Sequence, residues 1–225
     1  MKAQSNGHEH EFEPEYGLPE RLPAQEHILW QGSPHTGLVF CEVFHARALA
    51  VYFGLILALR GAHQFSMTGS WAEAFAAATW LAPLFVLALV LFWALAWLVA
   101  KTTVYTITDR RLVMRVGIVL SLTFNIPLSR LQSADVRHIG SKGAGEIALT
   151  LRPEDKIAYF HLWPHARPWR FAHPEPMLRC LPAVAGVAEL LRQAWTKAQA
   201  ELPVRQTHEP SADRPRRSFS DLEAA

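Results

Sequence analysis

Cysteine is scarce in this sequence of 225 residues, which contains only Cys41 and Cys180. A disulfide framework needs a patterned set of cysteines, and a structural zinc site needs about four ligands. The two cysteines are far apart and unpatterned, so neither kind of site organises the fold. We expect both thiols to be reduced and to face the cytoplasm.

A large excess of charge of either sign is also lacking. The net charge is +2, from 22 Lys and Arg against 20 Asp and Glu, which is too small to indicate a nucleic-acid-binding surface. The sequence starts with acidic and polar residues, so no secretory signal is expected. We expect residues 1–43 to form a cytoplasmic tail and residues 201–225, which lack periodicity, to form a disordered tail.

Catalytic and cofactor motifs are absent as well. The sequence has no GxSxG, HExxH or CxxC motif and no phosphate-binding glycine loop, so we expect neither an enzyme nor a cofactor. The segment His8–Glu11 could bind a metal weakly, but a metal site in a terminal tail is not favoured. A bacteriochlorophyll ligand is not favoured either, because the longest apolar run contains no histidine.

Charge is missing throughout that run, Ala74–Ala100. A membrane-spanning helix needs about 20 apolar residues, so the run predicts a transmembrane helix over about 74–100 rather than a buried helix of a soluble protein. The segment 45–64 is weaker, because only twelve uncharged residues separate Arg47 from Arg60. We favour a second transmembrane helix there, with both arginines reaching the membrane surfaces, over a core helix or a re-entrant segment.

Basic residues set the expected orientation of these helices. Lys101, Arg110, Arg111 and Arg115 follow the second helix, whereas the connection between the helices offers only Arg60. The positive-inside rule therefore predicts a multi-pass protein with both termini in the cytoplasm. The same four basic residues are candidates for contact with an anionic lipid surface, and the alternative is that they serve only as a topology signal.

The hydrophobic period changes from helical to two after residue 101. Alternating apolar residues predict short antiparallel strands, with a turn at 108–111 between the first two. Pro182 then opens an amphipathic helix with an apolar stripe from Val184 to Trp195. The predicted strands are 105–107, 112–116, 120–126, 145–152 and 156–163.

These elements predict a membrane-anchored α+β protein. A two-helix transmembrane hairpin over 44–100 is followed, over 101–200, by antiparallel strands and a closing C-terminal helix. This order of elements is that of a pleckstrin-homology (PH)-like fold, a small β-barrel or sandwich capped by a C-terminal helix. The alternating pattern predicts the strands and the helix but does not decide whether a barrel closes.

Several stretches resemble a known family. EHILWQG (26–32), and YTITDRRLVMRVG (105–117) with IPLSRLQSADV (126–136), resemble the bacterial PH domain of membrane proteins. HLWPHARPWRFAHPEPMLRCLP (161–182) resembles the photosynthetic complex assembly protein PuhB family of purple bacteria. The resemblance covers about residues 16–195. It implies a non-catalytic assembly factor for the photosynthetic reaction centre and its light-harvesting complex, in a bacterial inner (cytoplasmic or intracytoplasmic) membrane.

The segment 163–170 is the strongest candidate for binding a protein partner. It holds two Trp, two Arg and two Pro, and Trp and Arg anchor protein interfaces while Pro limits the entropy lost on docking. The alternative is a structural loop with its Trp side chains packed under the domain. The candidate residues are Trp163, His165, Arg167, Trp169 and Arg170.

A small domain that starts directly after a membrane helix meets other membrane proteins at high effective concentration. We therefore expect it to dock reaction-centre and light-harvesting polypeptides, and leave open whether it also forms a homo-oligomer. The alternative function is that of a general bacterial PH-domain membrane protein with a lipid-binding or envelope role. A genome neighbourhood with or without photosynthesis genes would separate these two hypotheses.

Overall fold

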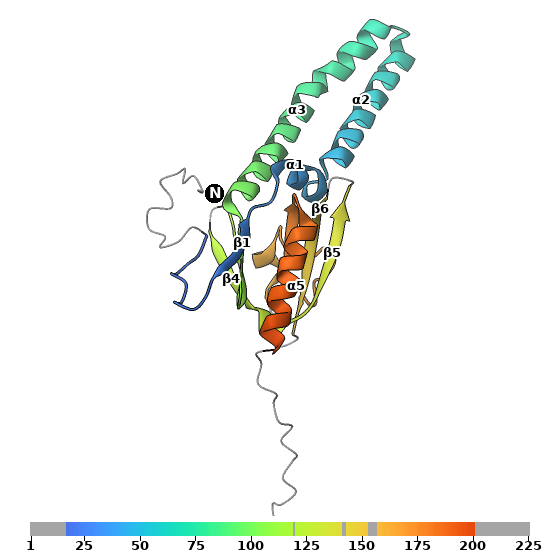
Figure 1. Cartoon of the computed structure of the whole chain (residues 1–225). Coiled ribbons are helices and arrows are strands. Elements are labelled where there is room, and N and C mark those ends of the chain that lie inside the picture. The colour runs from blue at the N-terminus through green and yellow to red at the C-terminus, as the bar shows by residue number, and fades with distance from the viewer. Residues whose placement is uncertain (1–16, 119, 141–142, 153–156, 201–225) are drawn as a thin grey trace, which may run out of the picture.

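The computed structural model describes residues 17–118, 120–140, 143–152 and 157–200, so the expected disordered tail 201–225 lies outside the described residues. Two long helices, α2 (Ala46–Thr68) and α3 (Trp71–Thr102), lie side by side and project from one end of a β-domain (Figure 1). They correspond to the two apolar helices predicted from the sequence. Helix α3 extends beyond both predicted bounds, whereas α2 starts at Ala46 and extends only beyond its predicted C-terminal bound.

Local sequence sets the point where the two helices meet. Gly69 ends α2 with a φ of +63°, the left-handed conformation that glycine adopts without strain. Ser70 then caps α3, because its hydroxyl accepts a hydrogen bond from the Glu73 backbone N–H at 3.4 Å, as in a Ser-x-x-Glu capping box. Both helices are long and apolar enough to cross a membrane, judged by length and composition.

Two antiparallel sheets form the β-domain, one of four strands and one of three. The four-stranded sheet has the order β1-β2-β3-β4 and the three-stranded sheet the order β5-β6-β7. Their strands are β1 (Ile28–Gly32), β2 (Val104–Thr108), β3 (Arg111–Val116), β4 (Leu122–Pro127), β5 (Leu131–Ile139), β6 (Ala144–Leu151) and β7 (Met177–Leu181). Four short helices connect them: α1 (Thr36–Leu38), the π-helix η2 (Val39–Val43), the 3₁₀ helix η3 (Leu128–Arg130) and α4 (Tyr159–Leu162).

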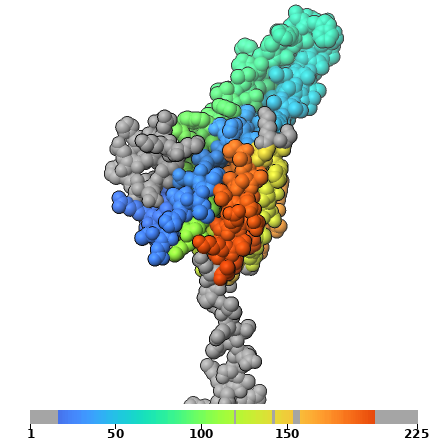
Figure 2. Space-filling model, viewed as in Figure 1, coloured from blue at the N-terminus to red at the C-terminus, as the bar shows by residue number. Residues whose placement is uncertain are grey.

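The C-terminal helix α5 (Val184–Ala200) covers the gap between the two sheets. It contacts β1 on one side and β5 and β6 on the other (Figure 2). Its predicted apolar stripe is confirmed, since Val184, Val187, Leu191 and Ala194 are all buried in the core between the sheets. Within the described residues the sheets do not join into a closed barrel, which decides the point that the alternating pattern left open.

Part of the expected tail 1–43 belongs to the folded domain instead. Strand β1 pairs antiparallel with β2, with Trp30 opposite Ile107. The Glu26 carboxylate, which is almost fully buried, accepts hydrogen bonds from Thr108 Oγ1 at 2.7 Å and from Arg111 Nε at 2.7 Å. The reason is that β2, whose five residues are all buried, would otherwise be an edge strand with unpaired backbone N–H and C=O groups inside the domain.

The prediction of a strand at 156–163 was wrong for the described part of that segment. Tyr159–Leu162 form α4, and the neighbours of β6 are β5 and β7, which were not predicted as strands. A helical turn fits the burial pattern, because Leu162 is fully buried while Phe160 is exposed two residues earlier. In a half-buried strand these two positions would share a face.

Candidate functional site

The chain between β6 and β7 carries all five residues predicted to bind a partner. After α4 it passes Trp163 and His165, and residues 166–176 then fold back on themselves. Ala166 forms an isolated bridge with Pro176, and the Arg167 backbone N–H donates to the Glu175 carbonyl at 2.9 Å. Residues 166–176 are called the arm below.

His165, at the base of the arm, is buried rather than exposed. Its Nε2 lies 3.0 Å from Thr103 Oγ1, and its Nδ1 lies 2.6 Å from the Tyr105 hydroxyl. The Tyr105 hydroxyl also accepts a hydrogen bond from the Arg179 backbone N–H at 3.2 Å, so its own proton is available to Nδ1. This pattern assigns the ring proton to Nε2, which donates to Thr103.

Both groups in that short contact are neutral. Burial, assisted by the charge of Arg179, lowers the pKa of His165 to about 3. Burial likewise raises the pKa of Tyr105 above its ordinary value. His165 is therefore a structural hydrogen-bonding residue that ties the arm to the end of α3 and to β2.

An ion-pair network lies next to His165, in which Glu146 and Arg179 are buried and Arg137 is exposed. Arg179 Nε donates to Glu146 Oε1 at 2.9 Å, and Arg137 Nη2 donates to Glu146 Oε2 at 2.7 Å. Arg179 Nη1 also donates to the Pro164 carbonyl at 3.2 Å. The network links β5, β6 and β7 to the start of the arm, so the arm rests on a fixed base.

Arg167 holds the arm against the sheet. Its Nη1 donates to Glu175 Oε2 at 2.8 Å and to Asp135 Oδ2 on β5 at 3.0 Å. The hydrogen bond to Glu175 is the main reason why the pKa of Arg167 is raised. Arg167 therefore positions the arm, and its guanidinium is already engaged within the domain.

Four aromatic side chains gather on the outside of the domain, and we call them the outer aromatic cluster: Tyr159, Phe160, Trp169 and Phe171. Three are strongly exposed, with Phe160 at 88%, Trp169 at 86% and Phe171 at 62%. The Phe171 ring lies 4.8 Å from that of Tyr159 and 6.5 Å from that of Trp169, between ring centroids. Exposed apolar patches of this kind commonly mark interaction sites.

The backbone at Trp169 helps to present its ring. Its φ of +66° lies in the left-handed region, which is uncommon for residues other than glycine. Such a conformation persists only where the surroundings enforce it, and here Arg167 and the Ala166–Pro176 bridge fix the arm on both sides. Arg170 follows Trp169 and places Nε 3.9 Å from Glu175 Oε1.

A cleft of about 600 Å³ opens beside the outer aromatic cluster. Its apolar lining includes Leu151 and Ile157, while Arg152, Arg170 and His173 supply polar groups. An apolar hollow with a few polar groups is the usual composition of a binding site. Among the described residues, no three His, Cys, Asp or Glu side chains gather in a way that could hold a metal ion.

The structure thus divides the five predicted residues. His165 and Arg167 act inside the domain, whereas Trp169 and Arg170 are exposed on the arm. Trp163 is exposed elsewhere, and its ring contacts Phe44 with centroids 6.5 Å apart. The sequence reasoning missed Phe160 and Phe171 of the cluster. A signal existed in the aromatic pair at 159–160 and in the Phe that follows Arg170.

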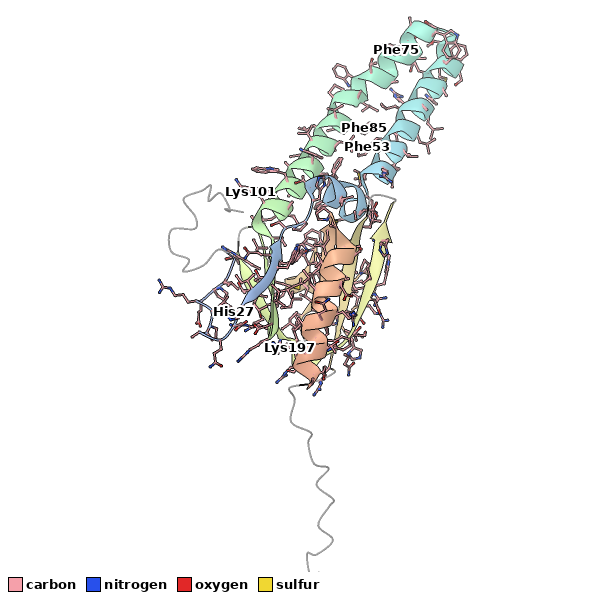
Figure 3. The ribbon with its side chains drawn as sticks, viewed as in Figure 1. His27, Phe53, Phe75, Phe85, Lys101 and Lys197 are labelled. Atoms are coloured by element: carbon pink, nitrogen blue, oxygen red, sulfur yellow. The ribbon has the colours of Figure 1, made fainter. Side chains whose placement is uncertain are left out.

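The four basic residues predicted at the membrane surface do not lie together. Lys101 sits at the base of the helix pair, with Nζ 4.9 Å from the centre of the Trp97 ring (Figure 3). Arg115 lies opposite Val104, at the end of β3 nearest to α3. Lys101 and Arg115 therefore both lie near the point where α3 joins the β-domain.

Arg110 and Arg111 lie at the opposite end of the β2–β3 hairpin. The five residues of β2 lie between α3 and this turn, so the turn is about 15 Å from α3 along the sheet. His27, whose backbone N–H donates to Asp109 at that turn, lies far from the helix pair in Figure 3. The hairpin therefore carries Arg110 and Arg111 away from α3, so the four cations do not lie at one level of the domain, and their contact with a lipid surface stays a prediction.

Both cysteines are free thiols, and they differ in environment. Cys41 is partly buried in η2, whereas Cys180 is fully buried in β7. Burial raises the pKa of Cys180 to about 12, so its reactive thiolate form is suppressed.

The sequence profile of the Bacterial PH domain matches residues 48–195. The chain belongs to the bacterial PH domain family. The matched region begins in α2 and ends in α5, so it includes the helix pair as well as most of the β-domain.

A relative in Rhodobacter capsulatus is 36% identical over 195 residues, which cover 87% of this chain and 90% of the relative. That relative is named an uncharacterized 23.7 kDa protein in the puhA 5′ region. Its name states no function, so the comparisons show the PH domain family and not the narrower PuhB family. No solved structure matches the chain.

Proposed function

We propose that this protein is a non-catalytic assembly factor for the photosynthetic reaction centre and its light-harvesting complex, of the PuhB type. The helix pair anchors it in a bacterial inner membrane, and the PH-like domain docks subunits in the cytoplasm. The observation that carries the proposal is the outer aromatic cluster, an exposed apolar patch formed by α4 and the braced arm. It belongs to a domain whose strand β2 starts one residue after an apolar helix.

Exposure of the helix pair supports the membrane anchor. Val51, Phe75 and Trp80 are 72%, 72% and 84% exposed, and they belong to outer faces that carry few charges. The core helix of a soluble protein would bury such side chains. A lipid environment suits this apolar surface, and a helix makes its backbone hydrogen bonds internally, as a membrane segment must.

The rigidity of the arm supports docking. Arg167, His165 and the Pro164 carbonyl are all held by partners inside the domain. Because little conformational freedom remains to be lost, the rings of the cluster could be covered at a low entropic cost. The short link to α3 keeps them near other membrane proteins at high effective concentration.

The gene context of the relative supports a role in photosynthesis. The Rhodobacter capsulatus relative is named after the puhA 5′ region, which is a photosynthesis locus. The Trp-Pro-His-x-Arg-Pro-Trp stretch that resembles the PuhB family forms the base and the first part of the arm in this chain. The cytoplasmic placement of both termini follows from the positive-inside rule, with Lys101 and Arg115 at the base of the helix pair.

A tagged pull-down tests the proposal. Membranes are solubilised mildly soon after cells switch to phototrophic growth, and recovered polypeptides are identified by mass spectrometry. We expect the wild-type chain to recover reaction-centre and light-harvesting polypeptides and W169A/F171A to lose most of them. The matched control is L120A/L122A, which removes two exposed apolar side chains from another part of the domain.

Each outcome decides a different point. Equal recovery by W169A/F171A would show that the outer aromatic cluster is not the docking surface. Failure of the wild-type chain to recover any of these polypeptides, together with normal reaction-centre levels in a deletion strain, would overturn the assembly function. A general PH-domain membrane protein with a lipid-binding or envelope role would then remain.

A further inference from the structure

The end of the helix pair can be located from its internal contacts. Phe53 and Phe85 stack between α2 and α3 with centroids 4.6 Å apart, and their side chains point toward each other in Figure 3. Near the far tip, a Cβ on Gly61 would lie 3.4 Å from the Ala74 carbonyl oxygen, so the helices approach closely there. At the end of the helix pair next to the β-domain, the ring of Phe44, just before α2, contacts that of Phe92 on α3, with centroids 5.9 Å apart.

Below that level, α3 no longer behaves as part of the helix pair. Ala96, Val99 and Ala100 are 0%, 3% and 6% exposed, because η2 and β7 pack against this part of α3. The apolar part of α3 outside the domain therefore runs from about Ala74 to Trp93. Those residues number about 20 and span about 30 Å, which is the thickness of the hydrocarbon core of a bilayer.

Aromatic side chains from three separate parts of the chain meet at this level. The ring of Trp93 on α3 contacts Phe40 of η2 with centroids 5.3 Å apart. Phe44, which follows η2, contacts both Phe92 and Trp163. Trp163 is 55% exposed although it contacts Phe44.

Trp163 cannot move freely away from the helix pair. Two residues later, His165 is hydrogen-bonded to Thr103, the residue that directly follows α3. The carbonyl of Pro164 accepts a hydrogen bond from the buried Arg179. The indole of Trp163 is thus held at the same level as the lower end of the helix pair.

We propose that Trp163 is a lipid-contacting anchor that seats the PH-like domain on the phospholipid surface. Its indole, in contact with Phe44 at the lower end of the helix pair, lies in the headgroup region, where an amphipathic ring is favoured because one side meets acyl chains and the N–H meets water. Trp163 would contact the phospholipid bilayer rather than a protein, because its exposed ring adjoins the apolar helix pair through Phe44. The proposal rests on the membrane anchor proposed above and removes Trp163 from the protein-docking residues.

Site-directed spin labelling tests the position of residue 163. The full chain with Cys41→Ser is reconstituted into vesicles of phosphatidylcholine and phosphatidylglycerol, with Cys180 retained because it is buried. Nitroxide labels are placed at 163, at 169 as the exposed matched control, and at 87 on α3 as the lipid reference. Collision rates with oxygen and with a water-soluble nickel chelate report depth at each position.

We expect the label at 163 to favour oxygen over nickel several-fold relative to the label at 169, and the label at 87 to favour oxygen most. If the label at 87 lies in lipid while those at 163 and 169 are equally aqueous, the Trp163 anchor is overturned and the membrane anchor stands. If the label at 87 is itself aqueous, the membrane anchor fails and the Trp163 anchor fails with it.

Hydroxyl-radical footprinting of the unaltered chain in the same vesicles avoids any effect of substitution. Exposures of 55% for Trp163 and 86% for Trp169 would by themselves give less than about a two-fold difference in oxidation. In vesicles we expect Trp163 to be oxidised several-fold more slowly than Trp169. This difference in oxidation rate should become smaller when the bilayer is replaced by a small detergent. Oxidation of Trp163 at the rate set by its exposure alone would contradict the proposal.

Discussion

The hydroxyl of Tyr105 lies 2.6 Å from Nδ1 of His165, and both side chains are buried inside the domain. Tyr105 belongs to the four-stranded sheet, whereas His165 stands at the base of the arm. The same hydroxyl accepts the backbone N–H of Arg179 on β7. One hydroxyl group therefore connects the two sheets and the segment that carries the candidate docking surface.

Tyr105→Phe removes this hydroxyl and keeps the ring. We expect the free energy of unfolding to fall by about 1–3 kcal/mol, because buried polar groups of His165 and Arg179 lose their partner. The measurement is the midpoint of thermal unfolding of the full chain in a mild detergent, followed by Trp fluorescence. Tyr159→Phe, which makes the same change in the outer aromatic cluster, should leave the midpoint unchanged. Equal midpoints for the two variants would contradict the assigned network.

Stability should fall as pH falls below the ordinary pKa of histidine. His165 has a pKa lowered from 6.5 to about 3, so between these values the unfolded chain binds a proton that the folded chain excludes. Its contribution is complete above pH 6.5 and declines as pH falls toward the folded pKa. Between about pH 7.5 and pH 5 we expect a loss on the order of 2 kcal/mol from this group.

The difference in unfolding midpoint between these two pH values measures this effect. His165→Asn should reduce the difference, since the titrating group is gone, whereas His161→Asn, at an exposed position, should keep it. An unchanged difference in His165→Asn would mean that other groups cause the pH dependence.

Sequence patterns predicted some elements well for a physical reason. Strands β2, β3 and β6 carry large apolar residues at every second position, and helix α5 buries one apolar stripe, so periods of two and 3.6 are visible in the sequence. Strand β7, MLRCL, is buried at all five positions and includes Arg179, so it shows no alternation. Strand β1 is likewise irregular, because its register shifts between Ile28 and Trp30.

The candidate site was predicted as a segment but not residue by residue. Trp163, His165 and Trp169 are close in sequence, yet one meets Phe44, one is buried against Thr103 and Tyr105, and one is exposed. The contacts of Trp163 and His165 are with residues about 60 or more positions away in the chain, and a local sequence pattern does not indicate such contacts.

Glu146→Gln should be among the most destabilising single changes in the domain. Arg179 is 7% exposed and relies on Glu146 for its counter-charge, and breaking one side of a buried ion pair costs about 3–5 kcal/mol. Glu189→Gln makes the same change in an exposed pair with Arg192 on α5, and there we expect no measurable shift. Thermal midpoints of the two variants check this, and a similar small shift in both would show that the buried network contributes little.

Gly145 should tolerate no side chain, in contrast to Gly186. A Cβ at Gly145 in β6 would lie 2.5 Å from the Arg137 carbonyl oxygen and 2.6 Å from Val184 Cγ1, so β5 or the start of α5 would have to move. We expect Gly145→Ala to cost about 1–3 kcal/mol, as overpacking usually does. A Cβ at Gly186 in α5 would point into open space, with no neighbour within 4 Å apart from the adjacent residues and backbone of its own helix, so Gly186→Ala should stabilise the helix by about 0.5–1 kcal/mol. Opposite shifts of the thermal midpoint are therefore expected, and a Gly145→Ala variant that melts at or above the wild-type midpoint would disprove the close seating of α5 on β6.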